Sequence, residues 1–279
     1  MRAFLTVCVM LLFNIPAPAG DVMIVAHRGA SLDAPQNTIP AFELAWEQGA
    51  DAIEGDFRLT KDGFIVCIHD ENTEKVSDTN IVVHESTLAE LRTLDVGAHH
   101  DEAFKGTLIP TISEVLATVP EGKRIYIEVK CGAEIIPSLL VEVKESGLKP
   151  EQIAVISFKE VVIQEFKAKA PHYKAFLLCS FKEGKNGQIM PPLARVLNSL
   201  KLTQADGLFS NTNVPLRVIG AVRKQDYEWH AYTINDLAEA RRMTGLGAQS
   251  IITDVPGYMK KHLVENAPAG EVAPQASMR

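Results

Sequence analysis

Short runs of β-branched and apolar residues alternate with amphipathic stretches from residue 22 to residue 252. The apolar runs have the length of β-strands. Strands are predicted at Val22–Ala26, Ala52–Phe57, Phe64–Ile68, Ile125–Val129, Ile153–Ser157, Ala175–Leu178, Gly207–Phe209, Glu228–Thr233 and Ile251-Ile252. Between most of them, apolar residues recur at helical spacing. Helices are predicted at 133–146, 159–170, 189–202, 214–224 and 235–244.

Two earlier helices are marked by their first residues. One begins at Asn37-Thr38-Ile39-Pro40, a polar cap followed by proline in the first turn. The other begins at Thr87, where Glu90 completes a capping box. These two starts extend the alternation of strands and helices into the amino-terminal half of the chain.

Regular alternation of strands and helices predicts a parallel sheet. At this length the favoured architecture is an α/β fold of the (β/α)₈ TIM-barrel type, with a doubly wound open sheet as the alternative. One strand is surplus to eight, and Asp62-Gly63 predicts a hairpin that would account for it. With Lys61 and Asp62 at the tip, paired residue numbers would sum to 123 and Glu54 would lie opposite His69, whereas another turn length would shift this register.

Polar residues interrupt the predicted strands at their carboxyl ends. These interruptions are His27-Arg28-Gly29, Glu54-x-Asp56, His69-Asp70 and Glu128-x-Lys130. The carboxyl ends of barrel strands face one mouth, where active sites are built. Residues two apart on a strand point to the same side. The pattern therefore predicts one pocket holding three carboxylates, two histidines, an arginine and a lysine.

Three carboxylates in one pocket repel each other and raise one another's pKa unless a cation lies among them. Hard oxygen ligands suit Mg²⁺ or Ca²⁺. The accompanying Arg28 and Lys130 suit an anionic substrate such as a phosphate ester. Two histidines beside such an anion suit general acid and base catalysis. Together these groups indicate phosphodiester hydrolysis.

Composition narrows the possible partners. The chain has 279 residues, a formal net charge of −7 and 46% hydrophobic residues, which is ordinary for a globular protein. An acidic chain of this kind argues against nucleic acid as the main partner. The cysteines Cys67, Cys131 and Cys179 lie in or beside apolar runs and are predicted to be buried thiols, with one disulfide and one free thiol as the alternative.

The two ends of the chain are expected to lie outside the fold. Residues 1–19 have one charge, an apolar run and Ala17-Pro18-Ala19, the layout of a secretory signal peptide. After cleavage, we expect no stable membrane anchor and an exported protein, periplasmic or extracellular and bacterial, because no N-x-S/T sequon suggests a eukaryotic route. Residues 264–279 are interpreted as a flexible tail. Sequence alone predicts no oligomeric state.

Ordered motifs from about residue 24 to residue 257 give the chain a family resemblance. They are Ala26-His27-Arg28-Gly29-Ala30, Ala34-Pro35-Gln36-Asn37-Thr38-Ile39, Gly49–Asp56, Leu59–Gly63, His69-Asp70, Leu94–Gly97, Ile109–Ile112, Ile127–Lys130 and Thr253-Asp254-x-Pro256. With these motifs the chain resembles the glycerophosphodiester phosphodiesterase family, which shares a barrel with phosphatidylinositol-specific phospholipases C. The resemblance implies one enzymatic domain over 20–263, with a small insertion at about 71–108 after the hairpin that carries His69.

The resemblance also implies roles for individual residues. It implies one divalent cation, Mg²⁺ or Ca²⁺, held by Glu54, Asp56 and Glu128. It implies His27 and His69 as the acid–base pair, without deciding which is the base in the first step.

The implied reaction is hydrolysis of a small-molecule glycerophosphodiester to an alcohol and sn-glycerol 3-phosphate, with Arg28 and Lys130 near the phosphate. In related enzymes the substrate's own 2-hydroxyl attacks phosphorus and gives a cyclic phosphate. The alternatives are a sphingomyelinase D-like or phospholipase C-like lyase that releases a cyclic phosphate, and a barrel that binds phosphodiesters without catalysis.

Two departures from the family pattern bear on the site. Gln36 replaces a usual glutamate, and Gln36 and Asn37 are expected beside the site rather than on the substrate. If that glutamate touches the metal or orients His27, the site here loses a negative charge. The favoured interpretation is a tolerated exchange, because amides also offer oxygen ligands. Tyr232 lies in a late motif where tryptophan is common and is expected to line the alcohol side of the pocket.

Overall fold

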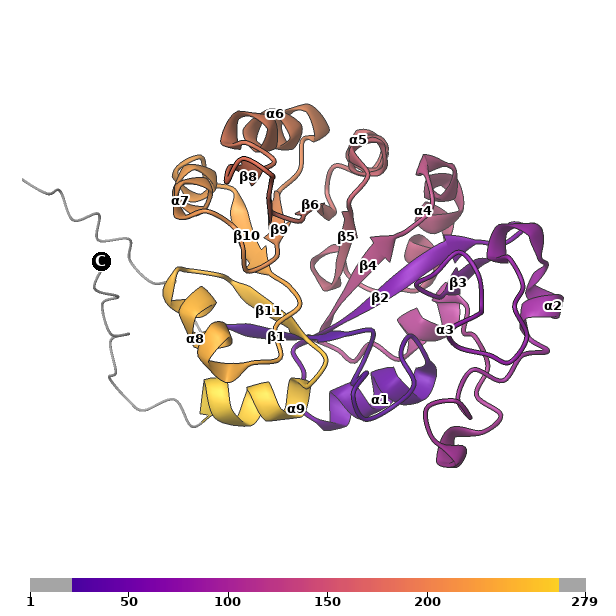
Figure 1. Ribbon diagram of the computed structural model, residues 1–279. Coiled ribbons are helices and arrows are strands. Elements are labelled where there is room, and N and C mark those ends of the chain that lie inside the picture. Colours follow the sequence, from indigo (N-terminus) through magenta and orange to yellow (C-terminus); the bar gives the residue numbers. More distant parts are fainter. Residues whose placement is uncertain (1–21, 266–279) are drawn as a thin grey trace, which may run out of the picture.

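A computed structural model describes residues 22–265 of the chain. Within them, parallel strands form a closed barrel, surrounded by helices (Figure 1). The barrel strands, in chain order, are β1 (Met23–His27), β2 (Ala52–Leu59), β4 (Arg124–Val129), β5 (Ile153–Ser157), β6 (Lys174–Cys179), β9 (Gly207–Ser210), β10 (Glu228–Ala231) and β11 (Ser250–Thr253). Closure is made by β1, which pairs in parallel with both β11 and β2. The predicted (β/α)₈ barrel is thus confirmed.

Helices cover the outside of this barrel (Figure 1). They are α1 (Ile39–Glu47), α3 (Ile112–Ala117), α4 (Ile136–Glu145), α5 (Glu160–Lys169), α6 (Leu193–Thr203), α7 (Leu216–Lys224), α8 (Leu237–Gly245) and α9 (Pro256–Met259). Helix α2 (Leu88–Leu91) instead lies to one side of the barrel, in the segment between β2 and α3 (Figure 1). The sequence analysis did not predict α3 or α9. No helix among residues 22–265 has the length and apolar character needed to cross a bilayer.

The predicted register of the first hairpin is wrong by one residue. Strand β3 (Ile65–Cys67) pairs antiparallel with β2, and the paired numbers sum to 124, as in Phe57 opposite Cys67. The turn holds three residues, closed by the Thr60 N–H on the Phe64 carbonyl at 2.8 Å, and Gly63 adopts φ +87°. Such a three-residue turn needs a glycine in the left-handed region. His69 therefore follows β3 and does not face Glu54 across the ladder.

A second hairpin replaces the start of the helix predicted at 189–202. Lys182–Glu183 (β7) pairs antiparallel with Ile189–Met190 (β8). Pro191 and Pro192 follow, and α6 begins only at Leu193. Apolar spacing alone could not separate a two-residue strand from a helical turn.

Apolar side chains form three separate clusters. The largest lies between the barrel and its outer helices. A second fills the barrel interior, with Tyr126, Phe176 and Phe209 at its centre. The third joins the β3 hairpin to the insertion through Val66, Ile68, Val83, Leu91, Leu94, Val96 and Ile109. The insertion is thus packed beside one side of the barrel by a core of its own.

The last described residues lie in the outer layer of the barrel. Val264 and Glu265, which were predicted to belong to the tail, continue a π-helical turn at Lys260–Glu265. The signal peptide predicted at residues 1–19 and the rest of the predicted tail lie outside the described residues. Cys67, Cys131 and Cys179 are free thiols, which excludes a disulfide among them.

Candidate active site

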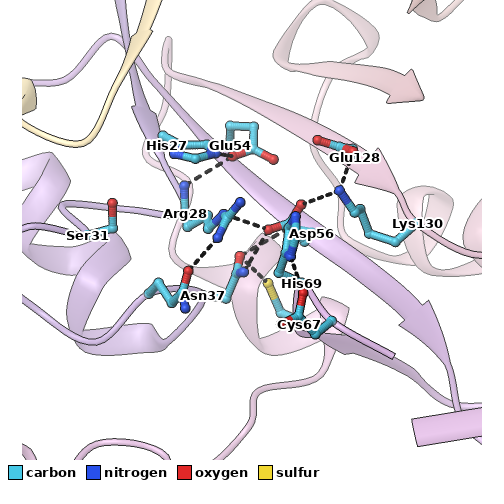
Figure 2. Close-up of polar contacts among 12 residues, drawn as sticks. His27, Arg28, Ser31, Asn37, Glu54, Asp56, Cys67, His69, Glu128 and Lys130 are labelled. Atoms are coloured by element: carbon cyan, nitrogen blue, oxygen red, sulfur yellow. Dashed lines mark hydrogen bonds and ion pairs between the residues drawn. The ribbon is translucent and has the colours of Figure 1, made fainter. Parts of the chain in front are cut away.

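The polar strand ends converge on one cavity of about 200 Å³ at the mouth of the barrel (Figure 2). Its polar half is lined by His27, Arg28, Glu54, His69, Glu128 and Lys130. Its other half is lined by Ile156, Phe158, Leu178, Tyr232, Thr233 and Ile252. Asp56 lies directly behind the polar half: ligand atoms of Glu54, Asp56 and Glu128 all lie within 4.8 Å of one another.

The turn after β1 directs Arg28 into this cluster. Arg28 and Gly29 both have positive φ, at 56° and 82°. A Cβ on Gly29 would lie 2.5 Å from the backbone of Ala41 in α1, so only glycine permits this close approach. The Arg28 N–H then donates to Glu54 Oε2 at 3.0 Å, and its Nε lies 3.0 Å from Asp56 Oδ2. These contacts with Glu54 and Asp56 hold the left-handed backbone at Arg28 in place.

Asn37, at the entry to α1, holds Asp56 through both its side chain and its backbone. Its Nδ2 donates to Asp56 Oδ2 at 2.8 Å, and its Oδ1 accepts from the Asp56 N–H at 3.1 Å. The buried Cys67 thiol donates to the same Oδ1 at 3.3 Å. Asn37 has φ 59°, a conformation that asparagine tolerates better than most residues. Asn37 thus holds Asp56 in place and is not among the residues that line the cavity.

The three carboxylates differ in charge balance. Burial, with the nearby Asp56 and Glu128 charges, raises the pKa of Glu54 well above its ordinary value. Burial and Asp56 also raise the pKa of Glu128 to about 7. Burial alone would raise the pKa of Asp56, but the charges of Arg28 and Lys130 outweigh it and lower that pKa. With all three carboxylates ionised, the cluster would carry one more negative charge than Arg28 and Lys130 balance.

This imbalance suits a divalent cation. The side-chain oxygens Glu54 Oε1 and Asp56 Oδ1 are buried and accept no hydrogen bond from residues 22–265. A buried oxygen without a donor is unfavourable unless another partner satisfies it. Oxygen-only ligand sets are those preferred by Mg²⁺ and Ca²⁺. The residues present thus fit the predicted metal centre.

Each of the two histidines is held by an aspartate. His27 Nδ1 lies 2.6 Å from Asp254 Oδ1, and His69 Nδ1 lies 2.6 Å from Asp70 Oδ1. The other ring nitrogen of His27, Nε2, lies 4.0 Å from Glu54 Oε2. Burial lowers the pKa of His69 below its ordinary value.

Sequence reasoning named Asp254 only as part of a motif and missed its contact with His27. The available signal was its place directly after the last strand, at the carboxyl end where His27 closes the first strand. Burial alone would raise the pKa of Asp254, but its hydrogen bond to His27 and the His27 charge lower it to about 2. Asp254 is therefore an ionised partner that fixes which ring nitrogen carries the proton.

Gln36 touches neither the carboxylate cluster nor His27. Its Oε1 accepts a hydrogen bond from Arg28 Nη1 at 2.6 Å. Gln36 lines a separate cavity of about 120 Å³ between Arg28 and the insertion. The exchange of glutamate for glutamine therefore acts on Arg28, and only through Arg28 on the metal centre.

Tyr232 lies on the apolar half of the cavity. Its hydroxyl lies 2.9 Å from Ser180 Oγ, and its ring meets Phe158 edge-on at 6.0 Å. The cavity thus places charged groups on one side and aromatic rings on the other. A small molecule with a charged centre and an organic arm fits that division.

Comparisons with known proteins agree with this chemistry. Residues 27–258 match the sequence model of the glycerophosphoryl diester phosphodiesterase family. A glycerophosphodiester phosphodiesterase of Caldanaerobacter subterraneus subsp. tengcongensis is 32% identical over 241 residues, 84% of this chain and 94% of that protein. One from Bacillus altitudinis is 30% identical over 241 residues, with the same shares of both chains, 84% and 94%.

Solved structures share the barrel. A glycerophosphodiester phosphodiesterase from Agrobacterium tumefaciens matches with a TM-score of 0.71 at 27% identity, over 85% of this chain and 97% of that one. A phosphodiesterase from Oleispira antarctica, in complex with the product sn-glycerol-3-phosphate, matches with a TM-score of 0.78 over 86% and 96% of the two chains. At 23% identity, the second likeness shows the fold alone.

Proposed function

The chain belongs to the glycerophosphoryl diester phosphodiesterase family, and on that premise we propose that the cavity at the barrel mouth hydrolyses glycerophosphodiesters to an alcohol and sn-glycerol 3-phosphate. The observation that carries the proposal is the convergence of Glu54, Asp56 and Glu128 with two aspartate-held histidines.

Arg28 and Lys130 bind and orient the phosphate. Arg28 Nε contacts Asp56 at 3.0 Å, and Lys130 Nζ lies 2.7 Å from Glu128 Oε1 and 3.5 Å from Asp56 Oδ1. Both cations are thus held in place by the carboxylate cluster and line the cavity. Positioned cations of this kind stabilise the charge that develops on phosphate oxygens in the transition state.

His27 and His69 move the protons. One Nε2 accepts a proton from the 2-hydroxyl of the substrate's glycerol, whose oxygen forms a bond to phosphorus. The other Nε2 donates a proton to the alcohol oxygen as its bond to phosphorus breaks, which releases the alcohol and leaves a cyclic phosphate. Water then attacks this phosphorus and gives a proton to the second histidine, while the first histidine returns its proton to the 2-oxygen as that bond breaks, which releases sn-glycerol 3-phosphate. Asp254 and Asp70 hold the opposite ring nitrogens, so each ring keeps its orientation through the proton transfers.

Members of this family depend on a divalent metal, and we propose Mg²⁺ or Ca²⁺ at Glu54, Asp56 and Glu128. When bound, such an ion supplies Lewis-acid stabilisation of the phosphoryl oxygens. The buried oxygens Glu54 Oε1 and Asp56 Oδ1, which accept no hydrogen bond from residues 22–265, support this assignment.

The test is an assay of metal-stripped protein with glycerophosphocholine, after readdition of Mg²⁺, Ca²⁺ or Mn²⁺ one at a time. We expect turnover only after readdition, with release of sn-glycerol 3-phosphate. His27→Ala and His69→Ala should each lower kcat by about 100-fold or more. Turnover that survives chelation, or that survives both substitutions, would show that another site carries the reaction.

We also propose that the protein is exported, to the periplasm or beyond the cell, after cleavage following Ala19. The support is the sequence of residues 1–19, an apolar run followed by Ala17-Pro18-Ala19. Fractionation of expressing bacteria, with amino-terminal sequencing of the product, tests this. Recovery of the uncleaved chain in the cytoplasm would contradict it.

A further inference from the structure

A groove of about 410 Å³ lies beside the 200 Å³ cavity at the barrel mouth, here called the reaction cavity. None of the residues proposed to bind phosphate, hold a metal or transfer protons lines this groove. The two spaces share Phe158 and Leu178 in their walls. The groove continues past Ser180, Lys182, Pro191 and the first turns of α6. It therefore lies between the end of β6, the β7–β8 hairpin and α6, about twice the size of the reaction cavity.

The walls of this groove are fixed by specific contacts. Tyr232 and Ser180 are joined at 2.9 Å, which ties the end of β6 to the segment after β10. Asn211 then anchors Phe181, accepting from its N–H at 2.8 Å and donating to its carbonyl at 3.0 Å. The β7–β8 hairpin starts from this anchored residue. The groove is thus part of the fold rather than a gap between loose loops.

Phe158 forms the boundary between the two spaces. It is a large apolar side chain at a polar active site, yet 48% of it is exposed. Covering an exposed ring with part of a ligand removes apolar surface from water and is favourable. Two other cavities touch the reaction centre, but they are separated from it by charged groups, Arg28 and His69 for one and Lys130 for the other. Only Phe158 and Leu178 offer an apolar passage among these.

A phosphodiester has two arms, which leave phosphorus in different directions. We propose that the alcohol arm crosses the Phe158 ring and lies in the groove between β6, the β7–β8 hairpin and α6, which favours hydroxylated alcohols without a positive charge. This inference rests on the proposed hydrolysis of glycerophosphodiesters. It assigns Phe158 and Lys182 as specificity residues for the alcohol.

The charged residues of the groove support the preference for alcohols without a positive charge. Glu160 and Arg195 pair at 2.5 Å, and Ser199 donates to the same Glu160 oxygen at 2.8 Å. Lys182 is then the remaining charged residue among those that line the groove. An ammonium group without a carboxylate partner repels a quaternary ammonium and donates a hydrogen bond to a hydroxyl oxygen. A polyol head group such as inositol fits this groove better than choline.

The test compares three diesters of glycerol 3-phosphate: those of inositol, choline and methanol. The methyl arm ends before the groove and serves as the substrate control. We expect the wild-type protein to prefer the inositol diester over the choline diester several-fold in kcat/KM. Phe158→Ala should lower kcat/KM about tenfold more for both large alcohols than for the methyl ester.

Lys182→Glu should shift the inositol-to-choline ratio several-fold toward choline, whereas Lys185→Glu, in the turn of the same hairpin, should not. Equal effects of Phe158→Ala on all three diesters, or an unchanged ratio in Lys182→Glu, would overturn the groove assignment while leaving the proposed hydrolysis intact. Absence of turnover of all three diesters by the wild-type protein would overturn both. Circular dichroism of each variant confirms that the comparison is made on folded protein.

Discussion

His27 Nδ1 lies 2.6 Å from Asp254 Oδ1, although the two residues are 227 positions apart in the chain. The contact follows from barrel closure. Strand β1 pairs in parallel with β11, with Ala26 opposite Thr253, so the next residue of each strand lies at the same level of the mouth. The first and last strands of the barrel therefore bring His27 and Asp254 together.

We predict that Asp254→Asn lowers kcat by about 100-fold or more while KM changes little. An amide can donate to Nδ1 and place the ring proton on Nε2, the nitrogen needed by the substrate. The pH profile of kcat should also change, because the charge that stabilises protonated His27 is lost. Ser31→Ala removes only a 3.0 Å hydrogen bond to Asp254 and should cost less than tenfold. A normal pH profile in Asp254→Asn would reduce Asp254 to a structural role.

Thermal unfolding should report the metal centre independently of turnover. We expect Mg²⁺ or Ca²⁺, at about 100 times its dissociation constant, to stabilise the chelator-treated wild type by about 2.7 kcal/mol. That corresponds to a rise in Tm of about 5–10 °C for a domain of this size. Glu54→Gln should abolish the rise. Glu151→Gln, which changes a carboxylate before β5 at the opposite end of the barrel, should retain it.

The geometry of Gln36 predicts a mild effect of restoring glutamate there. Because its side chain contacts Arg28 and not the carboxylate cluster, Gln36→Glu should leave metal affinity and kcat/KM within about threefold. Gln36→Leu removes the acceptor of Arg28 Nη1 and should lower kcat/KM about tenfold. Metal titrations by calorimetry and steady-state assays measure both. Metal binding tightened tenfold by Gln36→Glu would mean that this position reaches the ion.

Glu228, at the amino end of β10, predicts a pH dependence of stability that is separate from the active site. Its contacts with His230 and with Lys174 Nζ at 2.8 Å outweigh its burial and lower its pKa to about 2. The native state therefore binds fewer protons than the unfolded state, whose glutamate has a pKa near 4.5. The resulting stability is present above about pH 4.5 and is lost as the pH falls toward 2.

Since the Glu228 side chain is 31% exposed, we expect this contribution to be about 1–2 kcal/mol. Urea unfolding at several pH values, on wild type and Glu228→Gln, measures it. The difference in unfolding free energy between the two should shrink as the pH falls below 4.5. Glu183→Gln, in the exposed β7–β8 hairpin, serves as the control and should show no such trend. A difference independent of pH would contradict the assignment.

Local patterns were sufficient for much of the architecture. The alternation of apolar runs and amphipathic stretches located the barrel strands within one or two residues. The Thr87–Glu90 capping box is present as predicted, with both hydrogen bonds formed. The predictions were wrong in two short segments. One was the register of the first hairpin, which depends on the turn at Gly63, and the other was the strand at Ile189–Met190, which was predicted as helix. There, turn length and cross-strand pairing outweigh the periodicity of side chains.

The order of strands along the chain was enough to predict which residues could meet, because the carboxyl ends of parallel strands share one mouth of the barrel. It placed His27, Glu54, His69 and Glu128 there without any long-range information. Only the tertiary structure decided how they are held: which carboxylate supports each histidine, that Gln36 serves Arg28, and that an exposed Phe158 opens onto a second groove. A residue's place at a strand end fixes which mouth of the barrel its side chain faces. Hydrogen-bond partners and cavities depend instead on how strands that are far apart in the chain pack against each other.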